Sequence, residues 1–229
     1  VSTVFERDRV SPAISKALRQ VGRVWVACNS DKRMLVNEGL RSEHVEVHPI
    51  PYFDDEPLLA FQKQARRPGP IRFYHIGKWE PRKAQDLIME AFLTTFKRGE
   101  ATFVMKTSPG SLRKAVDGFP SSPRDCLRAL LGRDEVQKNG WTADNLKGGF
   151  ELIDAFIEPE AVTKLHAFGD VYVSYSRGEG FDMPAYDARL AGRPIIHTAT
   201  GPPLDFHEPQ VDMLVEATGT RPCHDIYDW

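Results

Sequence analysis

The stretch Ser174-Tyr-Ser-Arg-Gly-Glu-Gly-Phe-Asp-Met-Pro-Ala-Tyr-Asp187 decides the fold that this sequence predicts. It continues from an apolar run that predicts a buried strand, Asp170 to Ser174, and it contains an acid between two glycines, Gly178-Glu179-Gly180. Pro184 then predicts the opening of a helix whose first turn carries a second acid, Asp187. A strand, a glycine turn and a helix N-terminus are typical of anion sites in α/β proteins, because unpaired amides and the helix dipole face the ligand.

Strands and helices alternate on both sides of this stretch from residue 71 onwards. Such alternation predicts a parallel sheet with right-handed crossover connections. The fold class is therefore α/β, a Rossmann-like parallel sheet with helices on both faces. The other predicted strands are Ile71–Ile76, Ala101–Lys106, Phe150–Ile153, Pro194–His197 and Met213–Glu216, and the other predicted helices are Ala84–Phe96, Asp125–Leu131 and Glu160–Ala167.

The first 70 residues are organised differently. Ser11-Pro12 predicts a helix start, and the β-rich runs Val24–Cys28 and Val45–His48 predict two short strands. Residues 52–70 are rich in proline and charge, which is typical of a domain boundary or hinge. The predicted parts are residues 1–51, a linker at 52–70 and a second domain at 71–229.

Composition limits the class of protein. The chain has 229 residues and a formal net charge of -2, so it lacks the basic excess of a nucleic-acid-binding protein. No apolar run approaches the roughly 20 residues that span a bilayer. The three cysteines are widely spaced and odd in number. These features predict a reducing, cytoplasmic compartment, with peripheral attachment to a membrane as an option.

Two acids of the opening stretch are candidates for ligand binding. Glu179 and Asp187 can both face a cavity at the predicted helix N-terminus, where a carboxylate accepts two hydrogen bonds from sugar or ribose hydroxyls. The alternative is that Asp182 and Asp187 only complement the helix dipole, which is worth about 0.3–1 kcal/mol for each acid. The pattern of acids alone leaves both interpretations open.

A second charged group, Gly77-Lys-Trp-Glu-Pro-Arg-Lys83, follows the predicted strand at 71–76. Its cations Lys78, Arg82 and Lys83 are expected at the same edge of the sheet as Glu179. Cations in that place can neutralise a diphosphate and stabilise the charge that develops on a departing phosphate. A solvated charged loop is the alternative interpretation.

Several other chemistries have no motif in this sequence. The histidines and cysteines lack the spacing of metal ligands, so no metal site is predicted. Neither the P-loop pattern G-x-x-x-x-G-K-[ST] nor the nucleophile elbow G-x-S-x-G occurs. Gly178-x-Gly180 also lacks the third glycine and the distant acid of a dinucleotide fingerprint.

Taken together, these segments resemble the retaining GT-B glycosyltransferases, specifically the large group that includes glycosyltransferase family four. The most specific part of the resemblance is the pair of acids Glu179 and Asp187, separated by seven residues and followed by a small-residue helix and a strand. The segment Phe73–Lys83 is similar to the start of the family's donor-binding domain. Val24–Ser30 and Val45–Pro51 look like the end of its acceptor-binding domain, and the resemblance covers most of the chain.

The resemblance implies a role for each matching residue. Lys78 and Lys83 match the basic pair that holds the donor diphosphate, and Glu179 matches the acid that lies against the donor sugar; these three are the implied catalytic residues. Asp187 matches the second acid, on the nucleotide ribose. The other implied donor-binding residues are Gly77, the turn residues Gly180, Phe181, Asp182 and Met183, and Ala155 and Phe156 beside the base.

The implied reaction moves a sugar from a nucleoside diphosphate sugar to an acceptor hydroxyl, with retention at the anomeric carbon. Protein cations and helix amides neutralise the diphosphate in such enzymes, so the resemblance implies no cofactor and no bound metal. The implied acceptor is a glycan, a lipid or a small molecule. The alternative function is a non-catalytic module that binds a nucleotide or sugar, or one half of a split enzyme that needs a partner chain.

Several residues depart from the family's pattern, among them Gly201-Pro-Pro203 in place of a common glycine pair. Lys78 stands where arginine is more common, Asp182 takes a usual glycine position, and Asp187 replaces a glutamate. A carboxylate at position 182 repels a diphosphate unless it points to sugar hydroxyls or caps the helix. The chain matches only the end of the first domain, so the acceptor site is expected to lie mostly outside this sequence.

Overall fold

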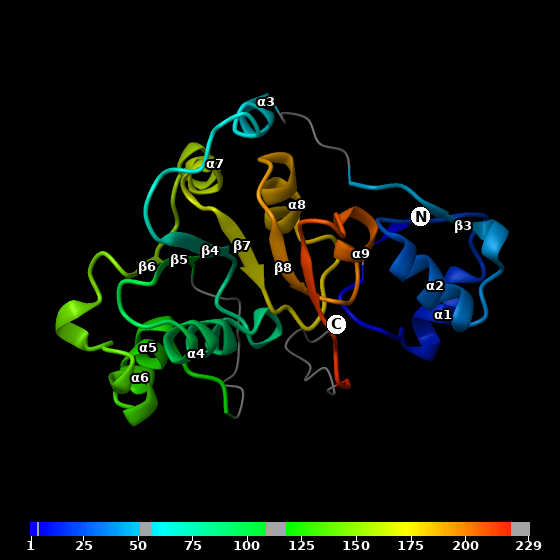
Figure 1. Cartoon of the computed structure of the whole chain (residues 1–229). Coiled ribbons are helices and arrows are strands. Elements are labelled where there is room, and N and C mark those ends of the chain that lie inside the picture. The colour runs from blue at the N-terminus through cyan, green and yellow to red at the C-terminus, as the bar shows by residue number, and fades with distance from the viewer. Residues whose placement is uncertain (4, 51–55, 109–117, 221–229) are drawn as a thin grey trace.

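The computed structural model describes residues 1–3, 5–50, 56–108 and 118–220. Within them the chain forms two parallel sheets, a small one beside the N-terminus and a large one built from the later residues (Figure 1). The small sheet has the order β1 (Ser2–Thr3), β2 (Val24–Val26) and β3 (Val45–Val47), with α1 (Pro12–Leu18) and α2 (Asn29–Asn37) between the strands. Its core consists mainly of valine and leucine side chains, among them Leu18 of α1, Val24 of β2, Leu35 of α2 and Val45 of β3.

The large sheet has six parallel strands, in agreement with the predicted α/β class. Each predicted strand between residues 71 and 216 is found within two residues of its expected bounds. In spatial order the strands are β6 (Phe150–Asp154), β5 (Ala101–Thr107), β4 (Ile71–Ile76), β7 (Val171–Ser174), β8 (Ile195–Thr198) and β9 (Met213–Val215).

Helices cover both faces of the large sheet, as predicted. One face packs around Met89, Phe92 and Trp141, and the other around Tyr74, Tyr172 and Ala185. The helices of the first face are α4 (Gln85–Thr95), α5 (Pro123–Leu131) and α6 (Asp134–Lys138); those of the second are α7 (Pro159–Phe168), α8 (Met183–Leu190) and α9 (Pro203–Phe206).

The strand order determines where a ligand site can form. From β4 the chain moves to β5 and β6 on one side, and it then crosses over to continue with β7, β8 and β9 on the other. The order therefore reverses between β4 and β7, and the loops that leave the carboxyl ends of these two strands separate there. Open α/β sheets bind their ligands in the crevice at such a point.

The predicted linker contains a short helix that the sequence pattern did not indicate, α3 (Glu56–Leu59). Leu58 is buried, and α3 packs against α7 and α8, above them in Figure 1. The described part of the linker is thus attached to the large-sheet unit through α3. Its predicted role as a hinge stays a prediction.

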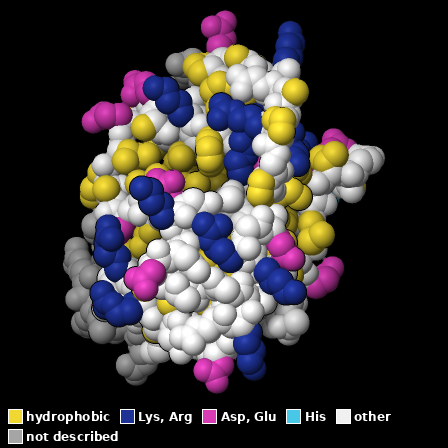
Figure 2. Space-filling view, turned by 60° about the vertical axis from the view of Figure 1, so that its left-hand side comes forward, with side chains coloured by type: hydrophobic (Ala, Val, Ile, Leu, Met, Phe, Trp, Pro, Cys, Tyr) yellow, Lys and Arg dark blue, Asp and Glu magenta, His cyan; other side chains and the backbone are white. Residues whose placement is uncertain are grey.

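Charge is unevenly distributed over the surface despite the small formal net charge. On the face turned forward in Figure 2, one group of Lys and Arg side chains lies in the upper half beside exposed apolar side chains, and the other Lys and Arg side chains and the acids are scattered over the face. None of the helices in the described parts of the chain is both long and apolar enough to cross a membrane.

Candidate functional site

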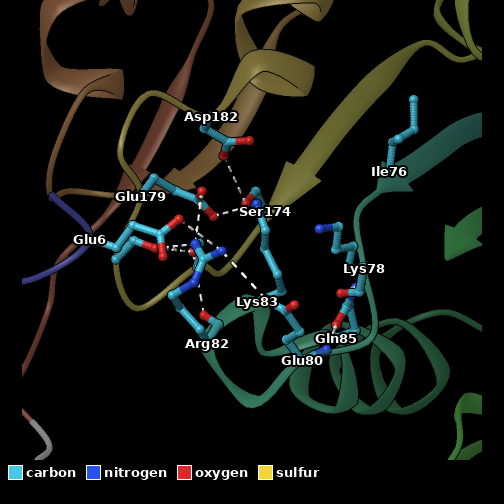
Figure 3. A network of polar contacts seen from close by, with 12 residues as sticks. Glu6, Ile76, Lys78, Glu80, Arg82, Lys83, Gln85, Ser174, Glu179 and Asp182 are labelled. Atoms are coloured by element: carbon cyan, nitrogen blue, oxygen red, sulfur yellow. Dashed lines mark hydrogen bonds and ion pairs between the residues drawn. The ribbon is translucent and has the colours of Figure 1, made fainter. Parts of the chain in front are cut away.

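Two loops meet where the strand order reverses. The loop after β4 carries Arg82 and Lys83, and the loop after β7 carries Glu179. The Arg82 Nη1 atom lies 2.9 Å from one carboxylate oxygen of Glu179, and the Lys83 Nζ atom lies 2.6 Å from the other (Figure 3). The sequence predicted that cations and acid would share this edge, and the structure brings Lys83 and Glu179 together.

The geometry of the first loop depends on a strained residue. Residues Pro81–Lys83 form a 3-10 turn that ends at Ala84, whose φ of 51° lies in the left-handed region. The Gln85 side chain holds the turn, because it accepts a hydrogen bond from the Glu80 amide and donates one to the Lys78 carbonyl. Lys83 is thereby directed toward the second loop.

Lys83 is mostly buried, with 12% of its side chain exposed. Burial acts against its positive charge, but the carboxylates of Glu179 and Asp182 outweigh burial and raise the Lys83 pKa. Lys83 is therefore a fixed cation at neutral pH. An anionic ligand that reached this amine would compete with Glu179 for it.

Arg82 connects the loop after β7 with the segment that follows β1 of the small sheet. Its Nη1 atom also donates to the Gly178 carbonyl at 2.6 Å, and its Nη2 atom lies 3.0 Å from the carboxylate of Glu6. Burial acts against the charge of Arg82, but Glu179 and Glu6 outweigh it and raise the Arg82 pKa. Glu6 follows β1 of the small sheet, so the site contains an acid from each part of the chain.

No motif in the sequence indicates Glu6 as a site residue. The segment that carries it is held in place by Asp31 of α2, whose carboxylate accepts a hydrogen bond from the Phe5 amide. A Cβ atom at Gly178 would collide with the Glu6 carbonyl oxygen. Gly178 therefore allows the small-sheet segment to approach the second loop closely, a packing role that was not predicted for this glycine.

The Asp182 side chain is buried and makes no capping hydrogen bond to α8. One of its carboxylate oxygens accepts hydrogen bonds from His197 Nε2 at 2.8 Å and from the Ser174 hydroxyl at 3.3 Å. Burial would raise the Asp182 pKa, but the hydrogen bond from His197 and the charge of Lys83 lower it to about 2. Figure 3 shows the Asp182 carboxylate pointing toward Ser174.

Asp187 also differs from its predicted place. Helix α8 begins at Met183 and has no acid in its first turn, so Asp187 lies in the second turn. Its carboxylate is 3.9 Å from Nε2 of His166 on α7, and 18% of its side chain is exposed. Asp187 thus lies against α7, and its implied contact with a ribose stays a prediction.

The two predicted lysines have different surroundings. Lys83 is ion-paired, whereas the exposed Lys78 makes no ion pair within the described residues and lies apart from the Glu179 network in Figure 3. Gly77, which precedes Lys78, covers His75: a Cβ at Gly77 would lie 2.8 Å from His75 Nε2. Burial lowers the His75 pKa to about 4, so this imidazole is neutral.

The remaining predicted residues divide into buried and exposed groups. Phe181 is buried and its ring packs against Tyr186 of α8 and Phe206 of α9, so it anchors the loop to these helices. Ala155 is exposed, and Phe156 is 77% exposed at the carboxyl end of β6. Gly180 is buried and Met183 is partly buried beside the start of α8. The donor-binding roles of all these residues stay predictions.

Metal ligands do not cluster in the part of the chain that the structure describes: no three side chains of His, Cys, Asp or Glu there are grouped so as to hold an ion. The charged groups of the site instead pair with one another. Arg82, Lys83 and Glu179 form an arrangement that can exchange partners when an anion enters.

No protein-family model matches the chain, and no curated protein matches its sequence. Solved structures do match its fold. Anabaena HepE in complex with UDP and glucose is 14% identical, with a TM-score of 0.57 over 91% of this chain and 56% of HepE. The lipopolysaccharide outer core galactosyltransferase WaaB is 18% identical, with a TM-score of 0.60 over 86% of this chain and 49% of WaaB. A structure from E. coli, described as trehalose-6-phosphate bound with UDP-2-fluoro glucose, is 14% identical, with a TM-score of 0.64 over 90% of this chain and 52% of that one.

At this level of identity the likeness shows the fold alone. It agrees with the predicted Rossmann-like sheet of a GT-B fold, and the predicted fold class is confirmed. The chain spans about half the length of the structures it matches.

Proposed function

We propose that this chain is the donor-binding part of a glycosyltransferase that moves a sugar from a nucleoside diphosphate sugar to an acceptor hydroxyl. The observation that carries the proposal is the contact of Arg82 and Lys83 with Glu179 where the strand order of the large sheet reverses. The fold shared with HepE, WaaB and the E. coli structure supports it.

The proposed roles follow from charge and position. A diphosphate that enters the site takes the Lys83 ammonium from Glu179, and the free carboxylate can then accept hydrogen bonds from donor sugar hydroxyls. As the bond between sugar and phosphate breaks, Lys83 stabilises the charge that develops on the departing phosphate. Lys78 is the second cation proposed for the diphosphate, and the exposed ring of Phe156 is the proposed contact for the base.

Retention at the anomeric carbon and independence from a bound metal are part of the same proposal. Arg82 and Lys83 supply two positive charges within reach of one acid, and such charges can balance a diphosphate without an ion. Asp187 is proposed to hold the ribose, which requires its side chain to turn away from α7. The acceptor is proposed to be a glycan, a lipid or a small molecule bound on the side of the small sheet.

Isothermal titration of the whole chain with UDP, GDP, ADP and their sugars tests the proposal. UDP is the first ligand to use, since HepE and the E. coli structure hold UDP or a UDP-sugar analogue. We expect Lys83→Ala to weaken binding, and Lys138→Ala, a matched change of an exposed lysine on α6, to leave it unchanged.

Failure to bind any of these nucleotides in a folded sample contradicts the proposal, as does binding that Lys83→Ala leaves intact.

A further inference from the structure

We propose that Asp182, Ser174 and His197 form a buried positioning device for the loop after β7, and that donor binding depends on the positive charge of His197. The inference deepens the proposed function and rests on it. It concerns the layer beneath the loop, where all three residues are at most 4% exposed. Neither His197 nor Ser174 belongs to the contacts made by Arg82, Lys83 and Glu179.

The backbone at Asp182 shows why the loop needs such a device. Asp182 has φ 62° and ψ 64°, the left-handed conformation that glycine adopts freely and other residues adopt at a cost. Its carbonyl nevertheless accepts the first hydrogen bonds of α8, from the Ala185 and Tyr186 amides. The conformation of Asp182 therefore sets the direction in which the helix N-terminus faces the site.

The hydrogen bonds of His197 assign its charge. Its Nδ1 atom lies 2.8 Å from the Thr198 carbonyl oxygen, which can only accept, so Nδ1 carries a proton. Its Nε2 atom lies 2.8 Å from the Asp182 carboxylate oxygen that also accepts from Ser174. Both ring nitrogens therefore donate, and His197 is an imidazolium ion paired with a carboxylate. His75, with one nitrogen bonded to the Val173 carbonyl, provides a neutral contrast at the same edge.

The surrounding groups explain why this charge bears on the donor. Asp182 faces His197 of β8 and Ser174 of β7, with His75 of β4, Lys83 of the first loop and Tyr172 of β7 close enough to interact electrostatically. The charges of Glu179 and Asp182 both act on Lys83. When His197 loses its proton, Lys83 must balance both acids, and the uncompensated charge of Asp182 repels a diphosphate.

A hydrolytic triad of Ser174, His197 and Asp182 does not fit this arrangement. The Ser174 hydroxyl donates to Asp182, and both nitrogens of His197 are already donors, so no base is available to take the serine proton. Ser174 is also only 1% exposed. The device therefore acts through the backbone and charge of Asp182, and its members are positioning residues.

The test compares UDP affinity between pH 6 and pH 9 in the wild-type chain and in Asp182→Asn, which removes the charge but tolerates a left-handed backbone. We expect the wild-type affinity to fall at least fivefold more than that of Asp182→Asn across this range. The protonation of UDP itself changes equally in both experiments, so the difference between the two pH profiles measures the effect of the charges on Asp182 and His197. We also expect His197→Ala to weaken binding more than tenfold, and the double variant Asp182→Gly/His197→Ala to recover most of the loss.

Parallel pH profiles for wild type and Asp182→Asn, or a double variant as weak as His197→Ala, would overturn the inference. If the wild-type chain binds no nucleotide at all, the proposed function fails separately. The device is then tested by NMR titration of the His197 imidazole, assigned by its loss in His197→Ala. Titration of His197 at or below an ordinary histidine pKa sinks the inference without reference to any ligand.

Discussion

Glu179 and Asp182 lie three residues apart in one loop, yet they are held in different ways. Glu179 is paired with Lys83 and Arg82, long side chains from another loop that are 12% and 16% exposed. Asp182 is paired with His197, a ring on a strand, and both side chains are 1% exposed. Long, partly exposed cations can exchange a carboxylate for a ligand, whereas both members of the Asp182 pair are enclosed by the surrounding protein. We call Glu179 with Arg82 and Lys83 the exchangeable layer of the loop, and Asp182 with His197 its fixed layer.

The largest expected effect comes from breaking the fixed layer. Removing one partner of a buried ion pair costs about 3–5 kcal/mol, because the other charge stays buried without compensation. We therefore expect His197→Ala to lower the free energy of unfolding by that amount, measured by urea denaturation at pH 6.

Glu179→Gln is the matched change in the exchangeable layer. Its cations can turn to water, and we expect a loss of about 1 kcal/mol, typical of a single hydrogen-bonded contact. Equal losses for the two variants would contradict the distinction between the layers.

Nucleotide binding should depend on the two predicted lysines to different degrees. Lys83→Ala removes a charged contact to the proposed diphosphate, and such contacts are worth about 1.5–3 kcal/mol, or roughly a tenfold to hundredfold change in affinity. Lys78→Ala should cost less, because Lys78 is exposed and lies outside the Glu179 network. Titration with UDP measures both, and a larger effect at Lys78 would reverse the assignment.

The pH dependence of stability distinguishes the layers further. Burial opposes the charge of His197, but its hydrogen bond to Asp182 and the charge of that acid raise the His197 pKa above 6.5. The stabilisation is therefore complete below pH 6.5 and is lost as pH rises through the higher folded-state pKa. The loss amounts to about 1.4 kcal/mol for each unit by which the folded-state pKa is raised.

Urea denaturation at pH 6, 7.5 and 9 measures this loss, with Asp182→Asn as the control. Burial also raises the Asp31 pKa to about 7, and this acid titrates in both proteins. Only the difference in pH dependence between the two proteins therefore measures the contribution of the Asp182–His197 pair to stability. An Asp182→Asn variant as pH-dependent as the wild type would show that another group controls the profile.

The sequence predicted the exchangeable layer better than the fixed one. Apolar runs separated by helices specify a parallel sheet, and loops at the carboxyl ends of β4 and β7 must then meet, so the contact of Lys83 with Glu179 was foreseeable. The partner of Asp182 was not, because the strand that carries His197 pairs with β7 only in the folded sheet. A single histidine in a strand pattern has no signal that distinguishes it from a core residue.

The contribution of the small sheet was also beyond sequence reasoning. Strand β1 has two residues, too few for any periodic pattern, and Glu6 follows it without a motif. Helix α3 was missed because prolines and charges surround its four residues. In both places tertiary contacts, rather than local preference, determine the structure.

The smallest expected effect tests the link between the two sheets. Glu6 shares Arg82 with Glu179, but 38% of its side chain is exposed, so the pair should add little to stability. Burial nevertheless raises the Glu6 pKa, since Arg82 compensates only part of it. A diphosphate that draws Arg82 away must overcome this competing carboxylate.

We therefore expect Glu6→Gln to bind UDP about two- to fivefold more tightly, as partial removal of one weak ion pair allows. Glu43→Gln, an equal change of charge at an exposed residue of the same sheet unit, should have no effect. Weaker binding by Glu6→Gln in titrations with UDP would mean that Glu6 supports the ligand site instead of competing with it.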